Sequence, residues 1–151
     1  MASPSTPESR IPQQIVVFSL GEEEYGLPIT QVQEIIRYTE PRAVASHLDW
    51  IRGVISLRGQ IIPVIDLTAR LGLGPGVSEP GKIIIVETET TNAGVVVDEV
   101  QEVLTLQEGD TEPLPVAGSD AVQGIAKIGS RLVVLLDARG LFGPGELGLA
   151  A

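Results

Sequence analysis

The sequence predicts an all-β protein made of two similar halves. Apolar residues make up 43% of the 151-residue chain but aromatic residues only 3%, so Ile, Val and Leu must fill the interior, and β-branched residues favour strands. The apolar runs are short and bounded by turn residues, which is typical of buried strands in a barrel or a sandwich. Segments that recur at a nearly constant spacing indicate an internal duplication.

Apolar runs of strand length occur on both sides of a break near residue 75. They are IVVFSL (15–20), WIRGVISL (50–57), QIIPVIDL (60–67), KIIIVET (82–88), GVVVDEVQEVLTL (94–106) and RLVVLL (131–136). Residues 28–36 are ambiguous. Pro28 suits the first turn of a helix and Val32, Ile35 and Ile36 share a helical face, whereas the duplicate segment at 96–104 favours a strand.

Two pairs of sequence segments, in the same order in both halves of the chain, indicate the duplication. A shift of 68 places residues 15–36 over 83–104, with Gly26 on Gly94 and the Val-Gln-Glu of 32–34 on that of 100–102. A shift of 71 places residues 53–66 over 124–137, with Asp66 on Asp137. We infer duplication of a unit of about 60 residues, a small size for one core, and a strand of one copy can cross into the other.

Composition also predicts where the folded barrels, the linker and the tails begin and end. Residues 1–14 combine three prolines with Ser, Thr and Gln and are expected to be a disordered tail. The Gly- and Pro-rich stretch 72–82 is expected to link a first barrel at about 15–71 to a second at about 83–142. Residues 143–151 would form a C-terminal tail.

Charge and composition exclude several classes of function. Ten basic residues against twenty acidic ones give a net charge of −10, which repels a phosphate backbone and argues against nucleic acid as a partner. The absence of cysteine excludes disulfide scaffolds and thiol chemistry and suits a reducing compartment. Because no apolar run approaches the roughly 18 residues of a membrane span, we expect a cytoplasmic protein without direct membrane insertion.

The sequence contains no catalytic constellation. The single histidine, His47, lies beside Ser46 and Asp49, but neighbours in sequence rarely have the geometry of a catalytic triad. Asp66 and Asp137 each precede a short helical pattern and are interpreted as N-caps. No phosphate-binding, nucleophile-elbow or metal-ligand motif occurs, so we expect no enzymatic activity, no cofactor and no metal.

The two copies differ at one hairpin. The first copy has Arg58-Gly59 where the second has Gly129-Ser130, so the duplicated fold does not require an arginine at this turn. Arg58 is therefore either a surface residue in an ion pair with a neighbour or a binding residue.

Three motifs resemble those of the CheW-type chemotaxis coupling proteins: YGLPITQVQEII (25–36), GVISLRGQIIPVIDL (53–67) and VVVDEV (95–100). The resemblance runs from about residue 14 to 142. It implies two tandem five-stranded SH3-like β-barrels, with short helices, around a groove. It also implies an adaptor that couples the cytoplasmic tip of a chemoreceptor (methyl-accepting chemotaxis protein) to a CheA-type histidine kinase, recruited to receptor arrays at the inner membrane. The alternative is a scaffold of the same type in a pathway for pili, gliding or another output.

The resemblance also implies the partner-binding residues. Glu34 and Arg58 match paired charged positions near the binding surface. The apolar positions that line the groove or adjoin it, and the glycines that flank the hairpin, are Val32, Ile35, Val100, Val103, Gly53 and Gly59.

Overall fold

The computed structural model describes residues 14–45, 49–72, 79–88, 91–113 and 121–141. Strands dominate these residues, which confirms the all-β prediction. The elements of the first half are β1 (Gln14–Leu20), β2 (Glu23–Pro28), the 3-10 helix η1 (Ile29–Gln31), β3 (Val32–Arg37), β4 (Ile51–Leu57), β5 (Gln60–Asp66) and α2 (Leu67–Arg70). Those of the second half are β6 (Lys82–Glu87), β7 (Asn92–Val97), β8 (Glu99–Thr105), β9 (Thr111–Glu112), β10 (Val122–Ile128), β11 (Arg131–Leu136) and α3 (Ala138–Leu141).

The strands form two sheets with equivalent topology. Sheet A has the order β8-β1-β2-β11-β10-β9, and sheet B the order β3-β6-β7-β5-β4. Replacing each of the first five strands of sheet A by its counterpart at an offset of 68 or 71 gives the order of sheet B. The parallel pairs agree in register, since Gly26 lies opposite Leu135 in one sheet and Gly94 opposite Val64 in the other. The structure thus confirms two SH3-like units related by duplication, with five equivalent strands each and the short strand β9 as a sixth in sheet A.

The two units are not the two halves of the chain. Strands β1 and β2 belong to sheet A with the second-half strands, whereas β6 and β7 belong to sheet B with β3, β4 and β5. The expected division into 15–71 and 83–142 is therefore wrong about which strands share a sheet. A run of apolar residues shows that a segment is buried, but it carries no information on which edge receives the strand.

The predicted boundaries fall mostly outside the described residues. Gln14 is the first residue of β1, so this residue does not belong to the tail predicted for 1–14. Residues 1–13 of that tail, 73–78 of the linker, His47 and the C-terminal residues 142–151 are not among the described residues.

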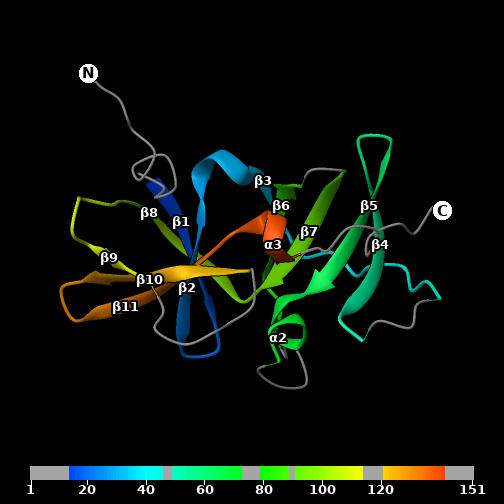
Figure 1. Cartoon of the computed structure of the whole chain (residues 1–151). Coiled ribbons are helices and arrows are strands. Elements are labelled where there is room, and N and C mark those ends of the chain that lie inside the picture. Colours follow the sequence, from blue (N-terminus) through cyan, green and yellow to red (C-terminus); the bar gives the residue numbers. More distant parts are fainter. Residues whose placement is uncertain (1–13, 46–48, 73–78, 89–90, 114–120, 142–151) are drawn as a thin grey trace.

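The central strands are covered on both faces. Runs of four or five consecutive buried residues occur in β1, β2, β5, β6 and β7, as expected for strands with no face toward water. One cluster joins Phe18 and Leu27 of sheet A to Ile84 and Val95 of sheet B. Figure 1 shows the two groups of strands side by side, with α3 between them. This larger cluster is shared by both sheets, and a second, smaller cluster lies within sheet A, with Ile15, Val17 and Val133 among its members.

Two ambiguous sequence features are settled by the structure. Residues 29–31 form one short 3-10 turn, after which Val32–Arg37 is a strand paired with β6, so the duplicate segment gave the better prediction. Asp66 Oδ1 accepts a hydrogen bond from the Ala69 backbone N–H at 3.1 Å, and Asp137 Oδ1 accepts one from Arg139 at 3.0 Å. The interpretation of both carboxylates as caps is confirmed.

Candidate functional site

The hairpin between β4 and β5 carries an unusual residue at its tip. Leu57 pairs with Gln60, which leaves Arg58 and Gly59 as a two-residue loop with φ values of +52° and +80°. Within the described residues, Arg58 is the one non-glycine residue with positive φ. A left-handed conformation costs a residue with a side chain about 1 to 2 kcal/mol, and the counterpart Gly129, with φ of +62°, avoids that cost.

Arg58 forms an ion pair with Glu34. Its Nη1 lies 2.5 Å from Glu34 Oε2, and the two side chains are 75% and 24% exposed. Glu34 is on β3 and Arg58 follows β4, yet β3 and β4 are opposite edges of sheet B. Because only a curled sheet brings its two edges together, the structure joins at the barrel end two residues that the sequence places 24 positions apart.

A recess of about 330 Å³ opens beside this pair. We call it the open recess. Sequence reasoning missed its amide side chains, which come from three strands and show no periodic pattern. The lining residues are Gln33, Glu34, Leu57, Arg58, Gln60, Ile62, Ile85 and Asn92.

The apolar candidates lie on both sheets. Val32 on β3 and Val100 on β8 are partly buried against the shared core, while Ile35 and Val103 are 39% and 49% exposed. Since Val100 and Val103 lie at the offset of 68 from Val32 and Ile35, the four form two equivalent pairs. None of the four lines the open recess.

Gly53 and Gly59 require glycine for two different structural reasons. A Cβ on Gly53 would lie 2.2 Å from the backbone oxygen of Arg42, and one on the counterpart Gly124 would lie 2.5 Å from that of Glu112. Both copies therefore need a glycine where an outer segment crosses the strand. A Cβ added to Gly59 would meet no atom within 4 Å. Only the positive φ of this residue therefore favours glycine at this position.

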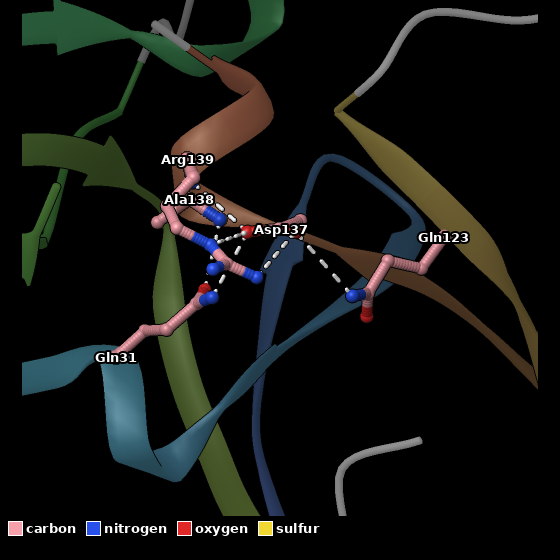
Figure 2. A network of polar contacts seen from close by, with 5 residues as sticks. All are labelled: Gln31, Gln123, Asp137, Ala138 and Arg139. Carbon is pink, nitrogen blue, oxygen red and sulfur yellow. Dashed lines mark hydrogen bonds and ion pairs between the residues drawn. The ribbon is translucent and has the colours of Figure 1, made fainter. Parts of the chain in front are cut away.

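A polar network joins the connection between the sheets to α3. Gln31 of η1 donates a hydrogen bond to Asp137 Oδ1 at 2.9 Å and accepts one from the Ala138 N–H at 2.8 Å. Figure 2 shows Asp137 between Gln31 and Gln123, with the Arg139 side chain beside it. Burial by itself raises the pKa of Asp137, but hydrogen bonds from Arg139 and Gln31 outweigh it and hold the pKa below its usual value.

The described residues offer no metal centre and no membrane span. Among them, no three His, Cys, Asp or Glu side chains cluster closely enough to hold a metal ion. Nor is any described helix long and apolar enough to cross a bilayer. The candidate site is therefore the polar surface at the end of sheet B, with the Glu34–Arg58 pair and the open recess beside it.

Comparisons with known proteins agree with this architecture. The chain belongs to the CheW-like domain family, whose profile matches residues 14–144. It is 34% identical over 142 residues to the chemotaxis protein CheW of Klebsiella aerogenes, covering 91% of this chain and 86% of that protein. The identity to CheW of Bacillus subtilis is 33% over 138 residues, with 88% of each chain covered.

A solved structure is also similar. The scaffolding protein TtCheW from Thermoanaerobacter tengcongensis is 40% identical, with a TM-score of 0.80 over 90% of this chain and 96% of that one. The chain is thus a scaffolding adaptor of chemotaxis signal transduction. These matches favour chemotaxis over the alternative pathways considered for the sequence.

Proposed function

We propose that this protein bridges the cytoplasmic tip of a chemoreceptor to a CheA-type histidine kinase, without catalysing a reaction itself. It would act in the cytoplasm, recruited to receptor arrays at the inner membrane. Membership of the CheW-like family supports both partners.

The observation that best supports the proposed binding site is the backbone conformation of Arg58. Its backbone has positive φ and its guanidinium reaches Glu34, whereas the second copy builds the same turn with glycine. An exposed ion pair adds only about 0 to 1 kcal/mol, which does not exceed the cost of the backbone strain. Strain retained without a gain in stability points to function.

The proposed receptor contact combines apolar packing with a charged rim. Exposed apolar side chains on the edge strands, Ile35 and Val103, together with the half-buried Val32 and Val100, would receive the apolar face of a receptor helix. Glu34 and Arg58 would form the charged hairpin rim that sets its register. Gly59 would permit the turn at the tip, and Gly53 the close approach of the Arg42 backbone behind it. A separate surface would hold the kinase. Because both sheets share the larger core cluster, a displacement at one contact would be transmitted to the other as a coupling free energy.

The test is binding of purified variants to a receptor-tip fragment and to the kinase regulatory domain. Glu34→Lys places two positive charges together at the rim and should weaken receptor binding about tenfold or more. The matched control is Glu112→Lys, which reverses the charge in the exposed Lys127–Glu112 ion pair of sheet A and should leave receptor binding unchanged. Equal receptor affinity for wild type and Glu34→Lys, both folded, would remove the rim pair from the site.

A further inference from the structure

The open recess of sheet B has a counterpart at the end of sheet A. Applying the offsets of 68 and 71, five of the eight lining positions keep their character, as one glutamine, one glutamate and three aliphatic residues. The other three positions differ, and each has a polar side chain in sheet B. Arg58 corresponds to Gly129, Gln60 to Arg131, and Asn92 to Glu24.

In sheet A these polar groups satisfy one another. Arg131 donates from Nε and Nη2 to both carboxylate oxygens of Glu24, each at 3.1 Å, and its Nη1 lies 2.8 Å from Glu102 Oε2. A guanidinium held by two carboxylates has most of its donors engaged. The polar side chains at this end of sheet A therefore engage one another.

In sheet B the arginine has moved two positions along the hairpin, from the strand to the tip. Arg58 pairs with Glu34, while an amide stands in the place of Arg131 and another in the place of Glu24. Within the described residues, the side chains of Gln60, which is exposed, and Asn92, which is partly buried, form no hydrogen bond to another residue. Below them, Ile62 and Ile85 form a buried apolar floor.

We propose that the open recess receives an amide group of the receptor tip, either an Asn or Gln side chain or a peptide group, and that Gln60 and Asn92 determine this specificity. An amide offers both a donor and an acceptor and matches the two free carboxamides. Glu34 and Arg58 have opposite charges, so the open recess carries no net charge that would favour an ion over a neutral amide. The inference rests on the proposed receptor contact and extends it beyond the rim pair.

The first experiment removes the hydrogen-bonding groups and keeps their shape. The double variant Gln60→Met and Asn92→Leu leaves Glu34 and Arg58 in place, and it should weaken binding to a receptor-tip fragment by about tenfold or more. The matched control, Arg131→Gln with Glu24→Asn, gives the other sheet the same amides. It should lower the melting temperature while receptor affinity stays unchanged.

A second variant closes the recess and keeps the inference testable if the first misfolds. Gln60→Arg with Asn92→Glu copies the Arg131 arrangement into sheet B, and it should retain the melting temperature while abolishing receptor binding. Full receptor affinity in both folded double variants would overturn the inference, and the proposed function would stand if Glu34→Lys still weakens binding. Loss of kinase binding with receptor binding intact would overturn the receptor as occupant. No receptor binding by wild type would contradict the proposed function itself.

Discussion

Arg58 shows how one residue can be chosen against local backbone preference. Its left-handed conformation suits glycine, and its ion pair with Glu34 is mostly exposed to solvent. Neither feature explains an arginine through stability alone.

Replacing Arg58 by glycine should therefore separate stability from binding. Arg58→Gly loses a weak ion pair and relieves positive-φ strain, so the free energy of unfolding should stay within about 1 kcal/mol of wild type. Arg58→Lys keeps the charge but loses the planar fork. Both should weaken receptor binding, as measured by titration calorimetry beside urea unfolding. A large loss of stability in Arg58→Gly would assign the residue to the architecture.

Gly53 should behave in the opposite way. Gly53→Ala forces a Cβ against the backbone oxygen of Arg42, and backbone yields less easily than a side chain. We expect a loss of about 3 kcal/mol in the free energy of unfolding, measured by urea denaturation. Gly59→Ala, with open space around its Cβ, should cost only about 1 kcal/mol. Equal losses at the two positions would contradict the close approach at Gly53.

At the scale of elements, the 3-10 turn η1 and helix α3 stabilise each other. Gln31 caps the first turn of α3 through Ala138 and also bonds Asp137. Helix α3 follows a strand of sheet A, and η1 leads into sheet B, so this contact fixes one connection between the sheets.

The same contact predicts a pH dependence. The pKa of Asp137 is lower in the folded state than its ordinary value, so the ionised carboxylate stabilises the fold at neutral pH. That contribution is present above about pH 4 and is lost as the pH falls through the folded-state pKa. Asp137→Asn should therefore be less stable than wild type at pH 7, with the difference shrinking toward pH 3 in urea titrations. A difference independent of pH would show that the charge of Asp137 contributes nothing.

At the scale of the whole molecule, each sheet depends on strands from both halves of the chain. Strands β1 and β2 complete sheet A, and β6 and β7 complete sheet B. Neither half contains a complete five-stranded unit.

Splitting the chain between residues 75 and 76 should therefore give two fragments that fold only together. Each alone exposes apolar strand faces that its partner would cover. Circular dichroism and gel filtration should show little cooperative structure for either fragment and a stable 1:1 complex on mixing. If the fragment 1–75 unfolded cooperatively on its own, the exchange of strands between halves would not be needed for stability.

The sequence by itself determined most of the strands, the duplication and the caps, because these depend on local pattern, but it left residues 28–36 ambiguous between helix and strand. Alternating or continuous apolar runs, Gly-rich turns and an Asp before a helical segment leave signals within a few residues. The offsets of 68 and 71 were readable for the same reason, and so was the family resemblance carried by three contiguous motifs.

Only the tertiary structure decided which sheet each strand joins and which polar side chains meet. The pairing of β1 and β2 with second-half strands, the contact of Glu34 with Arg58 across the ends of a curled sheet, and the closure of sheet A by Arg131 all depend on long-range approach. The two copies share nearly the same local pattern, so local signals cannot distinguish a strand that stays in its own unit from one that crosses. That choice depends on the total apolar surface buried when both sheets pack together.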